Sequence, residues 1–153
     1  MQNHCVIPSP VGQLYIEADD QGICRLDRTE EPLLAPQSAL LRQCCRELEE
    51  YFVGTRQVFS VPVHAEGTPF RKRCWQALLT IPYGCTISYG EQARRIGQPG
   101  AARAVGGANH HNPVCIIVPC HRVIGSDGQL IGYGSGLDMK QWLLLHEQHC
   151  SRA

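Results

Sequence analysis

A change in charge near residue 66 divides this chain into two parts of different character. Residues 1–66 contain five Lys and Arg against ten Asp and Glu, whereas residues 67–153 contain nine against four. The segment His64-Ala65-Glu66-Gly67 lies at this change and has the composition of a linker. A chain of 153 residues has room for one domain or two small ones. We therefore expect an N-terminal domain over residues 1–66 and a C-terminal domain over residues 67–153.

The composition indicates a globular protein without a membrane span. Hydrophobic residues make up 43% of the chain and charged residues 18%, which is typical of chains that fold around a core. The longest apolar stretch, Val114 to Cys120, is far too short to cross a bilayer. The first residues lack the basic start and apolar centre of a signal peptide. We therefore expect a cytoplasmic location, where thiols stay reduced.

The nine cysteines do not follow the pattern of a disulfide framework or a zinc site. Their number is odd, Cys44 and Cys45 are adjacent, and the C-x-x-C spacing does not occur. His146, His149 and Cys150 cluster near the end of the chain, but without paired ligand spacing. We expect no bound metal, and we expect most of these cysteines to be small buried apolar residues.

The N-terminal part has the pattern of a small α/β domain. Residues 11–18 and 22–27 are predicted to be short antiparallel strands joined by a turn. A helical pattern follows Pro36, with apolar residues recurring at i, i+4 and i+8, and Gly54 stands where it would end. Residues 57–63 could form one more strand. This part should therefore be an antiparallel sheet covered by one helix.

The C-terminal part is predicted to be mostly helical. Thr68 can cap a helix that begins at Pro69, and Ser88 with Glu91 has the spacing of a capping box. Gly97 would close this second helix, and a third begins near Ala101. Two short helices across a three-residue turn indicate a helix-turn-helix. The third helix is rich in Ala and Gly, which suits either close approach to a groove or tight packing against another helix.

The charge of this region favours a polyanionic partner. Residues 67–123 contain seven Lys and Arg and the single acid Glu91. Such a balance is typical of a surface that meets nucleic acid, although an ordinary solvated face would also account for it.

Cys120 is the candidate nucleophile. It follows Val114 to Val118, a β-branched run that is typical of a buried extended segment, and Pro119, which ends it. His121 and Arg122 come next, and both favour a thiolate. Because adjacent side chains of an extended chain point to opposite faces, His121 would need a bridging water or a local kink to reach the sulfur. Glu147, at the edge of an apolar helical stripe, is the candidate group to orient His121. A buried structural cysteine is the alternative.

Three motifs resemble those of a known family. They are Pro119-Cys120-His121-Arg122-Val123, Asn112-Pro113 and Arg103-Ala104-Val105-Gly106-Gly107-Ala108. The chain from about Phe70 to Glu147 is thereby similar to the O6-alkylguanine-DNA alkyltransferases, also called methylated-DNA-protein-cysteine methyltransferases. The resemblance implies an α+β fold, in which a ribonuclease-H-like N-terminal α/β domain precedes a mostly helical, winged helix-turn-helix domain.

The resemblance also implies a reaction. Cys120 would take the alkyl group from O6-alkylguanine, and from O4-alkylthymine, in duplex DNA, in one irreversible turnover for each molecule. His121 would act through water as the base, Glu147 would orient it, and Asn112 would bond to the same network. The alkyl group arrives attached to the DNA, so no cofactor is expected. The protein should act as a monomer.

DNA binding is implied to occur in the minor groove with the damaged nucleotide flipped out, because a stacked O6 atom cannot be reached in line. Tyr89 would rotate the 3′ phosphate and hydrogen-bond to the departing guanine, and Arg103 would fill the gap in the stack. Gln98, Ser126 and Arg122 are further expected DNA contacts, with residues 126–128 forming the turn of the wing. The base pocket is expected to be lined by Val123, Tyr133, Gly134 and Ser135.

Two positions depart from the family pattern, and three other functions compete. Gln92 stands where a leucine is usual, and Gly134-Ser135 changes the order of small residues in the loop. The rivals are a lesion-binding protein without an acceptor cysteine, a winged-helix regulator of undamaged DNA, and a cysteine hydrolase. Cys120 argues against the first. Sequence-specific binding to undamaged DNA would identify the second, and turnover of an ester or peptide the third.

Overall fold

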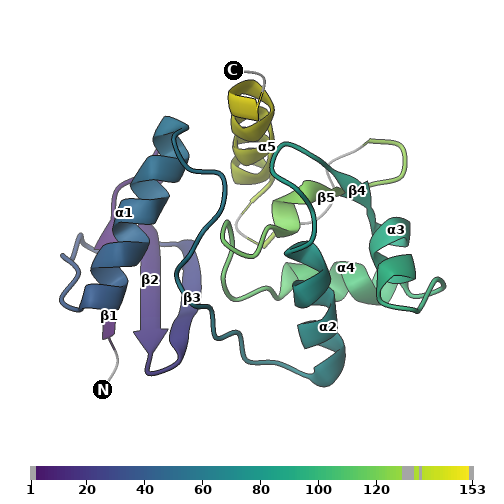
Figure 1. Ribbon diagram of the computed structural model, residues 1–153, viewed down its shortest axis with the longest axis horizontal. Coiled ribbons are helices and arrows are strands. Elements are labelled where there is room, and N and C mark those ends of the chain that lie inside the picture. The colour runs from purple at the N-terminus through teal and green to yellow at the C-terminus, as the bar shows by residue number, and fades with distance from the viewer. Residues whose placement is uncertain (1–2, 129–132, 135, 152–153) are drawn as a thin grey trace. The chain divides into compact units, whose positions relative to one another are not determined.

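The chain divides into two compact units, Met1–Glu66 and Gly67–Ala153. The computed structural model describes residues 3–128, 133, 134 and 136–151 (Figure 1). Each unit has its own buried residues and is described by itself.

The N-terminal unit is a three-stranded antiparallel sheet covered by one helix. The strands β1 (Asn3–Ile7), β2 (Leu14–Asp19) and β3 (Gly22–Arg28) lie in the order β1-β2-β3, and α1 (Ala39–Val53) packs on one face (Figure 1). This confirms the expected antiparallel sheet and helix, but β1 was not predicted. Its short sequence, Asn-His-Cys-Val-Ile, lacks the alternation of a half-buried strand.

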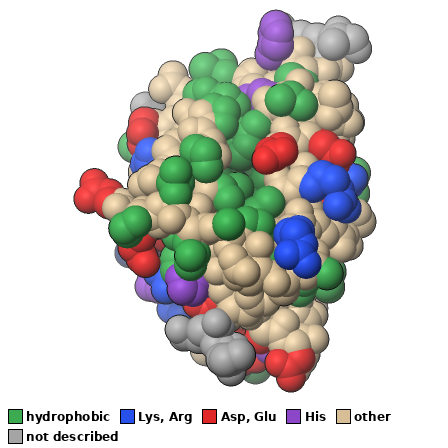
Figure 2. Space-filling view, turned by 90° about the vertical axis from the view of Figure 1, so that its left-hand side faces the viewer, with side chains coloured by type: hydrophobic (Ala, Val, Ile, Leu, Met, Phe, Trp, Pro, Cys, Tyr) green, Lys and Arg blue, Asp and Glu red, His purple; other side chains and the backbone are tan. Residues whose placement is uncertain are grey.

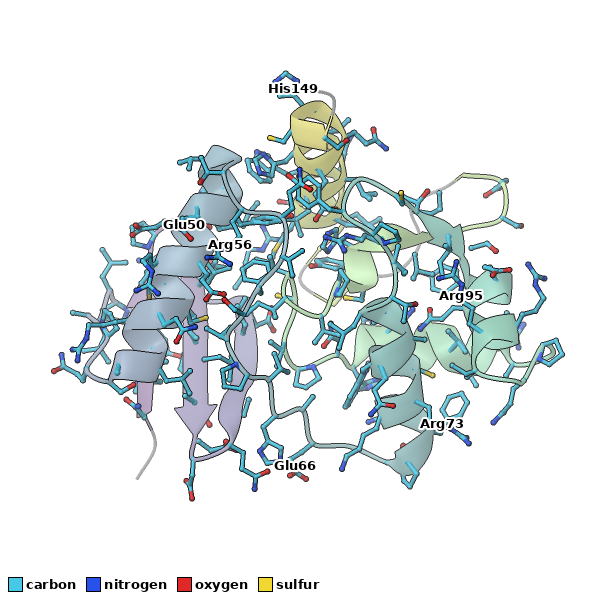
Figure 3. All side chains as sticks on the ribbon, viewed as in Figure 1. Glu50, Arg56, Glu66, Arg73, Arg95 and His149 are labelled. Carbon is cyan, nitrogen blue, oxygen red and sulfur yellow. The ribbon has the colours of Figure 1, made fainter. Side chains whose placement is uncertain are left out.

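Helix α1 begins and ends at residues with clear capping roles. It starts at Ala39, because the Ser38 hydroxyl accepts a hydrogen bond from the Leu41 amide at 3.1 Å, so the predicted start at Pro36 was three residues too early. At the other end Gly54 has a φ of 90°, the left-handed conformation that ends a helix. Glu50, in the last turns of α1, forms an ion pair at 2.7 Å with Arg56, which follows the helix (Figure 3).

Residues 57–63 are not a strand, contrary to the prediction. One parallel bridge joins Val63 to Ile23. The Glu47 carboxylate accepts hydrogen bonds from the amides of Ser60 and Val61 at 2.8 and 3.2 Å, and Pro62 has no amide hydrogen to donate. The amides of Ser60 and Val61 are therefore satisfied by a helix side chain and not by a neighbouring strand.

The surface seen in Figure 2 has no single dominant character. Acidic, basic and histidine side chains lie among hydrophobic ones. Among the described residues the exposed large hydrophobic side chains include Leu33 and Leu34, in the segment that connects β3 to α1.

The C-terminal unit is mostly helical. Its helices are α2 (Pro69–Leu78), α3 (Tyr89–Arg95), α4 (Ala102–His110) and α5 (Leu137–Ser151), with one 3₁₀ turn at Cys120–Arg122. The two-residue strands β4 (Ile87–Ser88) and β5 (Val123–Ile124) pair in parallel. Helices α2, α3 and α4 pack around a small core that consists of Cys74, Ala93, Val105 and Ala108. The overall class is α+β, as expected.

The predicted helix starts are confirmed. Thr68 and Ser88 accept hydrogen bonds from the amides of Arg71 and Glu91 at 3.2 and 3.0 Å. The capping box is only half formed, because the Glu91 carboxylate bonds to the guanidinium groups of Arg94 and Arg95. Helices α3 and α4 follow one another across a short turn, the arrangement that the helix-turn-helix prediction requires.

Gln92 fits the core through a polar pair. Its side chain is fully buried, its amide nitrogen donates to Asn109 Oδ1 at 3.0 Å, and Asn109 Nδ2 donates back to Gln92 Oε1 at 2.7 Å. Gln92 Nε2 also donates to the carbonyl of Cys74 at 3.0 Å. A reciprocal amide pair therefore joins α3 to α4 at the position where an apolar residue would otherwise pack.

Helix α4 has one buried face and one exposed face. Val105 and Ala108 are buried, and the Ala108 carbonyl accepts a hydrogen bond from Trp75 Nε1 at 2.9 Å. Arg103 and Gly107 lie on the exposed side, and a Cβ at Gly107 would meet nothing within 4 Å. One face is tightly packed, and the other can approach another surface closely.

The turn expected at residues 126–128 is present. The Gly128 amide donates to the Gly125 carbonyl at 2.9 Å, and Gly128 has a φ of 84°. The returning strand of the predicted wing lies outside the described residues. Among the described residues every helix is too short or too polar to cross a bilayer.

Candidate active site

Residues 114–118 form a buried turn directly before the candidate nucleophile. All five are buried as predicted, but they are not extended: the Val118 amide donates to the Val114 carbonyl at 3.0 Å, and Ile116 has a φ of 72°. The Asn112 side chain holds both ends of this turn. Its Oδ1 accepts from the Val114 amide at 3.0 Å, and its Nδ2 donates to the Val118 carbonyl at 2.8 Å. A side-chain clamp therefore overrides the β-branched preference for strand.

Cys120 lies at the start of the 3₁₀ turn and is 6% exposed. Asn112 Nδ2, the nitrogen that holds the turn, also donates to the Cys120 sulfur at 3.2 Å. The extended geometry assumed from the sequence for Cys120 and His121 is therefore wrong, because Pro119 leads into a turn. Asn112 contacts the sulfur directly, whereas the family resemblance implied only that Asn112 bonds to the His121 network.

His121, Glu147 and Arg122 form a buried chain behind Cys120. His121 Nε2 lies 2.7 Å from Glu147 Oε2, and Arg122 Nε donates to Glu147 Oε1 at 2.8 Å. The His121 and Glu147 side chains are at most 1% exposed. Burial by itself would raise the pKa of Glu147, but the hydrogen bonds from His121 and Arg122 outweigh it and hold that pKa well below its usual range.

His121 is held in its neutral form with one free nitrogen. Burial lowers the pKa of His121, and the hydrogen bond that His121 donates to Glu147, which acts in the opposite direction, does not offset this effect. Since a carboxylate only accepts hydrogen bonds, Nε2 carries the proton and Nδ1 keeps a lone pair. Among the described residues no group bonds to the buried Nδ1. The imidazole is thus oriented as a base whose accepting atom is unused.

Arg122 has a different role from the one expected. Its guanidinium donates to both oxygens of Glu147, and Nη1 donates to the Ile81 carbonyl at 2.7 Å. Arg122 is only 7% exposed, and its guanidinium is therefore paired with acceptors inside the unit. The expectation that Arg122 contacts DNA is therefore corrected: Arg122 positions Glu147.

Lys140 is a site residue that the sequence reasoning missed. Its side chain is fully buried, and its Nζ lies 3.4 Å from the Tyr89 hydroxyl. Burial lowers the pKa of Lys140 to about 8, against the opposing attraction of Cys120. Burial also raises the pKa of Tyr89, and Cys120 adds to this effect. The spacing of Lys140, Leu144 and Glu147 on one helical face was the signal that could have identified it.

The remaining predicted residues lie in varied surroundings. Val123 is buried in the β4–β5 pair, and Tyr133 is buried. Gly134 approaches α4 so closely that a Cβ would lie 2.9 Å from the His110 carbonyl oxygen. Arg103 and Ser126 are exposed and Gln98 is half-buried, as DNA contacts could be, whereas Ser135 lies outside the described residues.

Basic side chains are exposed on this unit. Arg73 projects from α2, and Arg95 projects from α3 (Figure 3). All nine cysteines lie in the described part of the chain and are free thiols. Within that part, no group of three or more His, Cys, Asp or Glu is arranged to hold a metal ion.

Comparison with known proteins connects both units to one family. Residues 69–149 match the DNA binding domain of 6-O-methylguanine DNA methyltransferase, and residues 4–65 match its ribonuclease-like domain. A methylated-DNA–protein-cysteine methyltransferase of Mycobacterium leprae is 48% identical over 95% of this chain and 93% of its own length. One from Methanosarcina acetivorans is 44% identical over 96% and 99%.

Solved structures connect the chain to the same family. The O6-methylguanine methyltransferase of Mycobacterium tuberculosis superposes with a TM-score of 0.89 at 45% identity, covering 100% of this chain and 95% of that one. Mycobacterium tuberculosis OGT in complex with DNA gives a TM-score of 0.88 at 45% identity, over 96% and 93% of the two chains.

Proposed function

Because this chain belongs to the 6-O-methylguanine DNA methyltransferase family, we propose that it repairs DNA by transferring the alkyl group of O6-alkylguanine to the sulfur of Cys120. The observation that carries the proposal is the setting of that sulfur. It lies 3.2 Å from Asn112 Nδ2, in front of a buried histidine whose second nitrogen is fixed on a carboxylate 2.7 Å away. The DNA-bound relative supports DNA as the partner.

The first step makes the thiolate. A water molecule bridges the Cys120 thiol and His121 Nδ1, and the thiol proton passes through it to that nitrogen. Glu147 stabilises the imidazolium that forms, because its carboxylate already accepts the Nε2 proton. Asn112 Nδ2 donates to the sulfur as negative charge develops on it. Arg122 keeps Glu147 ionised throughout.

The second step is an in-line displacement. The Cys120 sulfur forms a bond to the alkyl carbon as the bond from that carbon to O6 breaks, and the electron pair passes to the guanine. Tyr89 hydrogen-bonds to the departing base. It stays protonated because burial raises its pKa, and Lys140 next to its hydroxyl favours release of that proton when the base accepts it. Tyr89 thereby stabilises the leaving group.

The target nucleotide must leave the duplex to reach the sulfur of Cys120, a residue that is only 6% exposed. The helix-turn-helix enters the minor groove with the exposed small face of α4, and Arg103 takes the place of the flipped base. Gln98 and Ser126 contact phosphates. Unstacking costs a few kcal/mol, which these contacts offset.

The pocket for the flipped base is lined by Val123, Tyr133 and Gly134, whereas Ser135, which was also expected there, lies outside the described residues. The O4 atom of an alkylated thymine presents the same reacting group, so this lesion is a second substrate. The thioether product has no good leaving group, and each molecule therefore reacts once. The protein acts as a monomer, and it needs no cofactor because the alkyl group arrives attached to the DNA.

Intact mass spectrometry tests the proposal. After incubation with a duplex that contains one O6-methylguanine, the protein should gain the mass of one methyl group, and the gain should map to the peptide containing Cys120. The transferred methyl should never exceed one per protein. The Cys120→Ala variant should bind the duplex and remain unmodified. An unmodified wild-type protein, or repeated turnover on an ester or peptide, would refute the assignment.

A further inference from the structure

The N-terminal unit contains two neighbouring thiols that have no part in alkyl transfer. The sulfurs of Cys5 and Cys45 lie 3.7 Å apart, at hydrogen-bonding distance for two thiols. Cys5 belongs to β1, where it pairs with Ile16 of β2, and Cys45 belongs to the buried side of α1. Two elements that pack against each other therefore bring together two sulfurs that are 40 residues apart in the chain.

We propose that Cys5 and Cys45 are a redox-active pair, which a hydroperoxide oxidises to a reversible disulfide between β1 and α1. A disulfide has a sulfur–sulfur distance of about 2.05 Å, so the two atoms must approach by roughly 1.7 Å. The proposal therefore requires the two cysteine side chains to rotate toward each other.

The two sulfurs have different parts in the oxidation. Cys45 is 8% exposed and Cys5 is fully buried, so the oxidant meets Cys45 first. The Cys45 thiolate attacks one peroxide oxygen, which breaks the O–O bond and leaves a sulfenic acid and one water. The Cys5 sulfur then attacks Cys45, displaces the hydroxyl as a second water, and closes the disulfide. Two thiols and one hydrogen peroxide thus give one disulfide and two waters.

The surroundings distinguish Cys45 from the other cysteines of the unit, because the hydrogen bond between Cys5 and Cys45 raises the pKa of Cys5 itself. The hydrogen bond from Cys5 lowers the pKa of Cys45, against the opposing effect of burial. Burial raises the pKa of the adjacent Cys44. Burial also raises the pKa of Cys24 to about 11, and its sulfur faces the Glu17 carbonyl and carboxylate. Since thiolates are the reactive form, Cys45 is favoured over both neighbours.

Peptide mapping of the full chain tests the proposal. The protein is treated with hydrogen peroxide, its remaining thiols are blocked with N-ethylmaleimide in denaturant, and it is digested after Arg and Lys and after Asp and Glu. Cleavage after Glu17 or Asp19 separates Cys5 from Cys24, and cleavage after Arg42 and Arg46 isolates the peptide with Cys44 and Cys45. We expect a linked pair of peptides, two hydrogens lighter than their sum, that dithiothreitol separates.

Two serine variants identify the partner. Cys44→Ser should keep the linked pair, and Cys45→Ser should lose it. The wild type and Cys44→Ser decide the question even where Cys45→Ser does not fold, because Cys45 is then the one cysteine in its peptide. Loss of the link in Cys44→Ser would overturn the proposal. So would fully blocked Cys5 and Cys45 in a sample whose exposed Cys85 has been oxidised.

Discussion

Replacing Lys140 with methionine should stabilise the C-terminal unit while it slows repair. Burial lowers the pKa of Lys140 from the ordinary 10.5 to about 8. At about 1.4 kcal/mol per pH unit, this difference corresponds to roughly 3 kcal/mol for keeping the ammonium buried and charged at neutral pH. The variant loses the hydrogen bond to Tyr89, worth about 1 kcal/mol. We expect a net gain of about 2 kcal/mol.

The gain should depend on pH in a defined direction. Between about pH 8 and 10.5 the folded protein has released the Lys140 proton and the unfolded chain still holds it. The unfolded state then binds more protons, so the free energy of unfolding of the wild type rises with pH across this window. The advantage of Lys140→Met is therefore full below pH 8 and vanishes toward pH 10.5.

Urea denaturation followed by tryptophan fluorescence measures this effect, because both tryptophans, Trp75 and Trp142, lie in the C-terminal unit. With an m-value of about 1–2 kcal/mol/M, the midpoint at pH 7 should rise by about 1–2 M urea. Methyl transfer should slow about tenfold, as expected for the loss of roughly 1.4 kcal/mol of stabilisation at the leaving base. The exposed Lys72→Met should change neither quantity. A lower midpoint at pH 7, or a difference that does not shrink as pH rises, would refute the reasoning.

Three further predictions concern other parts of the unit. Glu147→Gln leaves the Arg122 guanidinium buried without its anion and should destabilise the unit by roughly 3–5 kcal/mol and abolish rapid transfer; Glu91→Gln, on the surface, should have little effect on either measurement. Gln92→Leu leaves the Asn109 amide unpaired and should lower the urea midpoint by an amount equivalent to about 1–3 kcal/mol. An unchanged midpoint would show that the amide pair does not stabilise the unit. Arg103→Ala should slow transfer from a paired duplex more than from a single strand, and equal slowing would contradict a role in base flipping.

Local signals in the sequence predicted most of the C-terminal helices. Thr68 and Ser88 cap α2 and α3 as expected, because a side chain that bonds the first free amides acts within four residues. Long-range contacts were harder to anticipate. Residues 57–63 have strand-like composition, yet Glu47, more than ten positions earlier, takes their amides. Nothing local in that segment indicates such a partner.

The candidate site was predicted only in part, because some of its contacts are local in the sequence and others are long-range. Cys120 and His121 lie in one short motif, and the position of Glu147 at the edge of an apolar helical stripe indicated it as their partner. The turn over residues 114–118 depends on both polar atoms of one side chain, Asn112, and a β-branched run gives no sign of that clamp. From the sequence, Arg122 was expected to be a charge at the surface. In the structure its guanidinium donates to the buried Glu147 carboxylate.

Ile116 links the durability of this site to its usefulness. A β-branched residue at a φ of 72° occupies backbone space that glycine or asparagine would enter more readily. Ile116 is also only 1% exposed, so glycine or asparagine there would lose more from the missing buried side chain than the relaxed backbone would return. A screen that rewards heat resistance alone should therefore keep a large apolar residue at position 116. Because the same residue belongs to the turn that places the acceptor sulfur, selection for robustness and selection for activity act in the same direction at this position.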